Sequence, residues 1–302
     1  MRRSAILLAL VLVGTGSLAA QTPVDRTIWV APGGFVRIWN LAGSVRVVGW
    51  DQDSLQVRGT VNQPPGGEFV ISPGKQGAKV AVWGTSEIGA RPTDLVVRVP
   101  RRSQLWVKTQ SANITVSDFE GGLDAVSVTG AIEVSGRPRE VYAESMGGAV
   151  NLAVATRSVR VKTGSSQVTL RGTIDDAMLT TVSGDVFAEN VQVMQGRFES
   201  VEGAIRYRGH FRSPSALEFI NHSGDIELVV PANAAAAVSI ETFEGTFEDE
   251  FGVPEKQTPG KVKGRQFSFT IGRDPGAEIA IRNFKGAVIL RKTAPMKVTQ
   301  LY

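Results

Sequence analysis

The chain has 302 residues, of which 42% are hydrophobic, so it can bury a sizeable core in one large domain or two ordinary ones. Lys and Arg together number 33 against 29 Asp and Glu, an excess too small to indicate a nucleic-acid-binding protein. No cysteine is present, which excludes a disulfide framework and a lipoprotein anchor cysteine. The fold must therefore be stabilised by burial alone.

Residues 1–20 have the pattern of a secretory signal peptide, with Arg2 and Arg3 before an apolar run from Ala5 to Val13 and small residues at the end. The apolar run is too short to span a bilayer comfortably, and a retained anchor is the competing interpretation. No later stretch reaches the roughly 18 apolar residues of a membrane helix. We predict an exported mature chain without a transmembrane segment, located in the periplasm, on the outer surface or outside the cell.

Residues 21–104 are predicted to form a β-rich N-terminal cap. Segments with alternating apolar residues, such as Phe35–Trp39 and Leu95–Val99, are separated by turns of Gly, Pro and Asp. We expect the tryptophan rings of this region to pack at the beginning of the next one, with stacking on sugar rings as the alternative. The five tryptophans are Trp29, Trp39, Trp50, Trp83 and Trp106.

Residues 105–247 contain an internal repeat built around a small residue that precedes an apolar one by two positions. These pivots are 18 residues apart from Ala112 through Gly130, Gly148 and Ser166 to Gly184, and Gly203, Gly224 and Gly245 follow after 19, 21 and 21 residues. Apolar or small residues recur seven and five positions before each pivot. Spacing of two within a segment indicates strands, and the fixed period indicates strands stacked on copies of themselves. The repeat predicts an all-β fold, a parallel β-solenoid of about eight rungs.

One column of the repeat, three positions before each pivot, is always small and hydrogen-bonding. Its parity matches the apolar columns, so these side chains should point into the core. An unpartnered buried hydroxyl costs roughly 1–3 kcal/mol, but a hydroxyl stacked under another can donate to one neighbour and accept from the next. We interpret the column as a structural ladder that comprises Thr109, Ser127, Ser145, Thr163, Thr181, Ser200, Asn221 and Thr242.

Residues 248–302 are predicted to form a C-terminal β cap, with strands at Gln266–Ile271, Ala277–Arg282 and Val288–Leu290. Asp249 falls in an inward column, where its charge would repel a stacking partner. With the N-terminal region folded over the first rung, both ends of the solenoid are then covered. We therefore predict one continuous domain over residues 21–302 that is a monomer.

No constellation of residues in the sequence supports catalysis or metal binding. His210 and His222, the only histidines, would supply at most two metal ligands. Asp185 and Asp225 share the position after the pivot but lie two rungs apart, beyond the range of an inverting glycosidase pair. The acidic cluster at residues 244–250 lacks the alternating oxygen ligands of a calcium loop. We predict no catalytic, cofactor-binding or metal-binding residue and no cofactor.

Three features together carry a family resemblance. A strand at Gly43–Val47 is followed by Gly49–Trp50–Asp51, a strand at Leu95–Pro100 leads into the repeats, and the chain closes at Phe267–Leu290 with Gly286 before a short strand. In these features the chain resembles the bacterial DUF4097 family of exported β-strand-repeat proteins, which carries an adhesin label. The resemblance covers residues 28–292. It implies a β-solenoid on the bacterial cell envelope and no known reaction.

These observations together favour a non-enzymatic, exported scaffold or adhesin-like binding module of the cell envelope. Its partner would be another envelope component or a glycan, and nucleic acid is not expected. One alternative is a self-assembling structural protein, because bare solenoid ends can stack on each other. A polysaccharide-active enzyme is a further alternative, but it would need an acid–base pair on one face, which the sequence does not offer.

Overall fold

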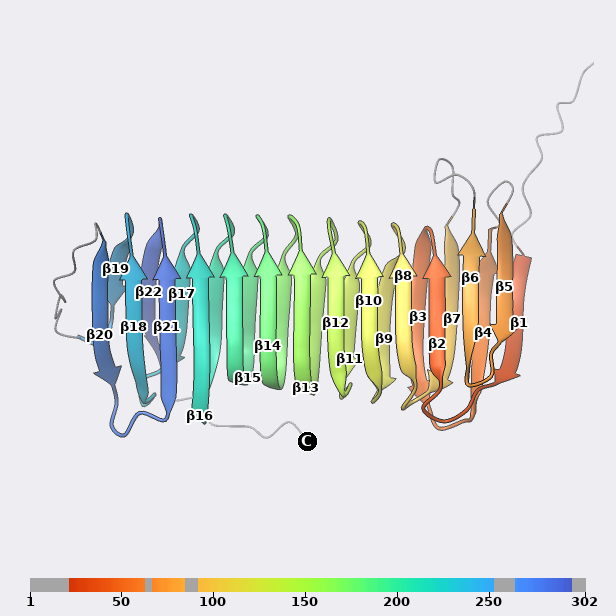
Figure 1. The fold of residues 1–302 in the computed structure, drawn as a ribbon, viewed down its shortest axis with the longest axis horizontal. Coiled ribbons are helices and arrows are strands. Elements are labelled where there is room, and N and C mark those ends of the chain that lie inside the picture. The colour runs from red at the N-terminus through yellow and green to blue at the C-terminus, as the bar shows by residue number, and fades with distance from the viewer. Residues whose placement is uncertain (1–21, 63–66, 85–91, 253–263, 295–302) are drawn as a thin grey trace, which may run out of the picture.

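The computed structural model describes residues 22–62, 67–84, 92–252 and 264–294, which form an elongated stack of strands that run across its long axis (Figure 1). Within these ranges every regular element is a β-strand, and the predicted all-β solenoid is confirmed. The predicted signal peptide lies outside the described residues. No helix in the described part of the chain is long and apolar enough to cross a membrane.

Each rung of the solenoid consists of a front strand and a back strand that meet at the pivot. Front strands pair in parallel with front strands: β10 lies between β8 and β12, with Ala125 opposite Val107 and Ala143. The first rungs contain β8 (Gln104–Thr109), β9 (Asn113–Phe119), β10 (Gly122–Ser127), β11 (Ile132–Gly136) and β12 (Glu140–Ser145). The residues that alternate inward form one continuous buried core.

Farther along the stack, the back strand of one rung continues directly into the front strand of the next. The resulting long strands pair in parallel over most of their length. They are β13 (Val150–Thr163), β14 (Val168–Thr181), β15 (Val186–Ser200) and β16 (Ile205–Asn221). The rung with its pivot at Gly224 comprises the end of β16 and β17 (Ile226–Pro231).

The pivots are small because the backbone of the preceding rung passes close to them. A Cβ atom built on Gly148 would lie 2.1 Å from the carbonyl oxygen of Gly130, and one on Gly203 would lie 2.0 Å from that of Gly184. No side chain fits at these distances without a local shift of the backbone, so glycine is required at these two pivots. Ser166 instead donates a hydrogen bond from its hydroxyl to the carbonyl of Gly147 at 2.7 Å.

The repeat predicts about eight rungs, and the structure differs from the order of the sequence at the last of them. Seven rungs, with pivots from Ala112 to Gly224, follow one another, but the rung at Gly245 does not stack on the rung at Gly224. A rung from the C-terminal region, with its pivot at Gly286, lies between them. It is made of β21 (Ala277–Asn283) and β22 (Ala287–Thr293), and the displaced rung is made of β18 (Ala236–Thr242) and β19 (Thr246–Asp249).

Charge explains why the C-terminal rung enters the stack. The rungs on either side are acidic on their outer surfaces, and the inserted rung is basic. Arg282 contacts Glu218 on one side at 2.7 Å and Glu241 on the other at 3.4 Å. On the back face Arg291 likewise contacts carboxylates of both neighbouring rungs. Without the inserted rung, Glu218 and Glu241 would face each other without Arg282 between them.

The N-terminal region contributes parallel rungs as well, which the prediction of a cap over residues 21–104 did not include. Strands β2 (Phe35–Asn40) and β3 (Gly43–Trp50) stack directly on β8 and β9, and β6 (Gly77–Trp83) and β7 (Thr93–Pro100) stack on β2 and β3. Antiparallel strands then end the stack at both extremities. They are β1 (Thr22–Trp29), β4 (Ser54–Val61) and β5 (Glu68–Pro73) at one end and β20 (Arg265–Ile271) at the other.

Candidate ligand-binding groove

The tryptophans lie on the outside of the solenoid, and Trp39 contacts Trp83 and Trp106 beside the first rung of the repeat. Trp29 is 64% exposed and Trp83 is 42% exposed, and the other three are partly exposed. The reason is the parity of the strands. On β2 the buried residues are Val36 and Ile38, so Trp39 must point to the opposite side.

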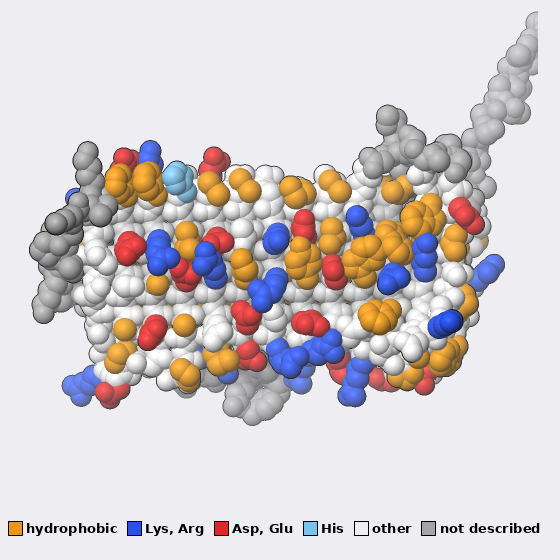
Figure 2. Space-filling view, in the orientation of Figure 1, with side chains coloured by type: hydrophobic (Ala, Val, Ile, Leu, Met, Phe, Trp, Pro, Cys, Tyr) orange, Lys and Arg blue, Asp and Glu red, His pale blue; other side chains and the backbone are white. Residues whose placement is uncertain are grey.

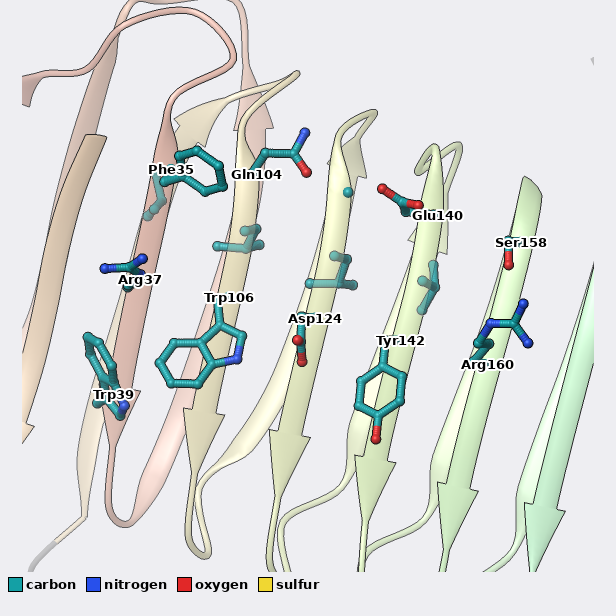
Figure 3. A pocket seen from close by; sticks show the side chains of 15 residues that line it. Phe35, Arg37, Trp39, Gln104, Trp106, Asp124, Glu140, Tyr142, Ser158 and Arg160 are labelled. Atoms are coloured by element: carbon teal, nitrogen blue, oxygen red, sulfur yellow. The ribbon is translucent and has the colours of Figure 1, made fainter. Parts of the chain in front are cut away.

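A shallow groove of about 720 Å³ crosses the front face near the N-terminal end, over strands β2, β8, β10, β12 and β13. Figure 2 shows hydrophobic side chains gathered over this part of the surface. Each strand contributes outward-pointing residues at the same height, so the groove runs along the solenoid axis (Figure 3). We call it the front groove; the side chains labelled along it are Phe35, Arg37, Trp39, Gln104, Trp106, Asp124, Glu140, Tyr142, Ser158 and Arg160.

Aromatic rings and a lysine form the N-terminal end of the front groove and the surface beside it. Trp39 stacks on Trp83 with ring centroids 5.5 Å apart, and Trp106 meets Trp39 edge to face at 4.8 Å. The ammonium group of Lys79 lies 4.2 Å from the ring centroid of Trp83 and 5.1 Å from that of Trp39. At an exposed site such a cation–π contact is worth about 0.5–1 kcal/mol.

Asp124 lies in the middle of the groove, in register with Trp106 on one side and Tyr142 on the other. Its Oδ1 atom is shielded from solvent and has no hydrogen-bond partner. Burial raises the pKa of this carboxyl, and the charge of Glu144 raises it further. Tyr142 donates a hydrogen bond to Glu144, which is the main reason that the pKa of Tyr142 rises to about 12.

The predicted ladder residues are all buried, but most of them bond to the backbone instead of to each other. The pivot amide donates to the ladder oxygen three residues earlier, as from Gly148 to Ser145 at 2.9 Å. The ladder side chain in turn donates to the pivot carbonyl of the preceding rung, as from Ser145 to Gly130 at 3.0 Å. The hydroxyl-to-hydroxyl contact that we expected occurs from Thr109 to Ser127 at 2.8 Å.

Further ladder side chains bond in the same ways. The pivot amide donates to Ser127, Thr181, Ser200, Asn221 and Thr242, and Thr163 donates to the carbonyl of its own pivot, Ser166. Asn40 and Asn283 belong to the column in addition to the predicted ladder, Asn40 next to Thr109 and Asn283 between Asn221 and Thr242. Each lies three residues before a glycine, Gly43 at the start of β3 or Gly286 directly before β22, and the sequence does contain this signal.

The residues considered for catalysis or metal binding have structural contacts instead. His222 stacks on Phe284, and His210 lies in another column, opposite Gln192. Asp185 accepts a backbone amide of the next rung at 2.8 Å, as does Asp225 at 2.7 Å. Within the described ranges, no three His, Asp or Glu side chains are placed to hold a metal ion.

Comparison with protein families places this fold. The model of the Toastrack DUF4097 family matches residues 44–267. The chain belongs to this family. The match confirms the resemblance drawn from the sequence. It covers all the repeats at residues 105–247 and the part of the front groove that lies on β8, β10, β12 and β13, while β2 lies outside it. No curated protein matched the chain.

Two solved structures have similar folds. A putative adhesin from Parabacteroides merdae superposes with a TM-score of 0.56 at 10% identity, covering 89% of this chain and 96% of that one. A putative lipid binding protein from Parabacteroides distasonis superposes with a TM-score of 0.53 at 12% identity, covering 88% and 96%. At these identities the comparison shows a shared fold alone.

Proposed function

We propose that this Toastrack protein is an exported, non-enzymatic binding module of the cell envelope and that it binds its ligand in the front groove. The observation that carries the proposal is the composition of that surface. Trp39 and Trp106 present partly exposed rings, while Asp124 stands beside them without a partner. Exposed aromatic rings with a few convergent polar groups are typical of ligand sites.

A glycan is the ligand class that the front groove favours. The apolar faces of sugar rings can stack on tryptophan, and sugar hydroxyls bond to amide, guanidinium and carboxylate groups. The groove offers both kinds of contact, with Gln104 and Arg37 beside the rings and Arg160 at the far end. Because it crosses five strands along the solenoid axis, it has room for several units of a polymer.

The non-enzymatic part of the proposal is supported by the contacts of the candidate acids. A polysaccharide-active solenoid would need two free carboxyl groups facing one bond of the substrate. Asp185 and Asp225 are instead committed to backbone amides of neighbouring rungs. In the groove, Glu140 pairs with Arg139 at 2.8 Å.

We also propose that the protein acts as a monomer and not as a filament. Antiparallel strands β4, β5 and β20 pair with the terminal parallel strands β7, β6 and β18, so a second solenoid cannot continue the parallel stack at those three strands. Sedimentation of the mature chain in moderate salt should give one monomeric species. Filaments of the intact chain in negative-stain micrographs would contradict this.

The test of the binding proposal is a glycan array probed with the mature chain and two matched variants. Trp106→Ala removes a ring from the groove, and Trp29→Ala removes an exposed ring outside it. We expect Trp106→Ala to weaken binding about tenfold or more, as losses of anchoring aromatic residues do. Trp29→Ala should bind like the parent, and equal loss in both variants would contradict a site in the groove.

A further inference from the structure

Asp124 stands between two aromatic side chains on three adjacent strands. Trp106 of β8, Asp124 of β10 and Tyr142 of β12 are in direct register, and all three point out from the front face (Figure 3). Neighbouring strands are about 4.8 Å apart, which leaves room for a small group above the carboxylate between the two rings. The strands are part of the rigid stack, so this arrangement exists before any ligand binds.

The carboxylate of Asp124 lacks the partner that other acidic groups near it have. Glu140 pairs with Arg139, Asp176 pairs with Arg160 at 3.2 Å, and Glu144 accepts from Tyr142. Among the described residues Asp124 forms no ion pair, and its Oδ1 is buried without a hydrogen bond. A partly buried negative charge without a counter-charge destabilises a protein. A bound cation would compensate the charge of Asp124.

The tryptophan surface beside Asp124 already holds an ammonium group. Lys79 places its Nζ over the rings of Trp83 and Trp39, at the distances of a cation–π contact. At Asp124 the aromatic neighbours Trp106 and Tyr142 are again present, but no lysine within the described ranges forms such a contact there. Trp106 and Tyr142 could therefore form cation–π contacts with the cation of a bound ligand.

We infer that Trp106, Asp124 and Tyr142 form a subsite for an ammonium group, and that the ligand is a glycan containing unacetylated amino sugars. The inference rests on the proposed function and specifies its ligand. A neutral hydroxyl could satisfy the Oδ1 atom but would leave the negative charge uncompensated. The subsite lies within the groove, with Phe35 and Trp39 on one side and Arg160 on the other, so a ligand extending both ways is favoured over a small free amine.

The experiment compares two tetrasaccharides that differ only in acetylation. A tetramer of glucosamine and its fully N-acetylated counterpart are titrated into the mature chain by calorimetry, in a mildly acidic buffer that keeps the amines protonated. We expect the glucosamine tetramer to bind at least about tenfold more tightly, in line with a cation–π contact combined with a carboxylate. Asp124→Asn, which conserves shape and removes the charge, should abolish that preference.

Glu133→Gln is the matched control, because Glu133 is an exposed carboxylate on the back strand of the same rung. It should retain the preference, since it removes the same charge from the opposite face. Equal affinities of the parent for the two tetrasaccharides, or a preference that survives in Asp124→Asn, would overturn the inference. Equal binding of both sugars that is lost in Trp106→Ala would overturn it and still support a glycan site in the groove. Binding of choline alone, with neither tetrasaccharide bound, would overturn it in favour of a different ammonium ligand.

Discussion

The two ends of the solenoid have the same kind of buried core, but they differ in the side chains on their outer surfaces. Inward columns at both ends are filled by Val, Ile, Leu and Phe. On the outside, the N-terminal end carries the tryptophans and the unpaired Asp124, whereas the C-terminal end carries ion pairs that link successive rungs, such as Glu218 with Arg197 and Arg282 (Figure 2). The inward columns thus build the rungs, and the outward columns serve either ligand binding or rung order.

The largest expected effect comes from the feature that both ends share, the pivot. In Gly148→Ala the new Cβ would lie 2.1 Å from the carbonyl oxygen of Gly130, so the two rungs must separate locally. We expect a loss of about 2–4 kcal/mol in the free energy of unfolding, measured by urea denaturation. Gly147→Ala is the control, since its nearest neighbour would be 3.6 Å away; it should change stability by less than about 0.5 kcal/mol. Similar losses in both variants would show that the close contact at the pivot does not cause the destabilisation.

The period of 18 predicts rungs, pivots and buried columns, but it does not encode which rung lies on which. Val238 and Ile279 occupy equivalent inward positions, and either could follow Leu217. The order depends on ion pairs between outward-facing side chains of neighbouring rungs. The sequence alone does not show which residues form those pairs. The groove was missed for a related reason. Trp106, Asp124 and Tyr142 are 18 residues apart in the sequence. They can be recognised as one surface site only when the strand register and the exposure of each side chain are both known.

The rung order can be tested by reversing one charge. Arg282→Glu places a third carboxylate between Glu218 and Glu241, where the parent has two ion pairs. We expect a loss of about 1–2 kcal/mol at low ionic strength that shrinks as salt is added, because the side chains are half-exposed and screened. Hydrogen exchange should accelerate in β21 and β18 and remain unchanged in β8 and β10. Uniform acceleration along the whole stack would contradict a local role.

Removing one hydroxyl of the ladder should reduce the free energy of unfolding by a smaller amount. Thr163 is 6% exposed and donates its hydroxyl to the carbonyl of Ser166 at 2.9 Å. Thr163→Val keeps the shape and leaves that carbonyl without this donor, so we expect a loss of about 1 kcal/mol in the free energy of unfolding. Thr115→Val on the back face, where the threonine side chain is partly exposed, should cost less than about 0.5 kcal/mol. Equal losses in thermal or urea unfolding would contradict a structural role for the column.

The smallest effect is predicted to have the opposite sign. Because burial and Glu144 raise the pKa of Asp124 above 3.8, the folded state binds its proton more tightly than the unfolded state. Stability then falls as pH rises from the ordinary value through the raised one, and the penalty persists at neutral pH. Asp124→Asn should therefore stabilise the protein at pH values above that window and have no effect below it. The gain should be less than about 1 kcal/mol because the side chain is only partly buried.

Asp176→Asn is the control, because it removes a carboxylate paired with Arg160, and it should not stabilise the protein. Urea unfolding of both variants at several pH values measures the difference, and a destabilised Asp124→Asn at neutral pH would show that the carboxylate already has a favourable partner and is not held free for a ligand.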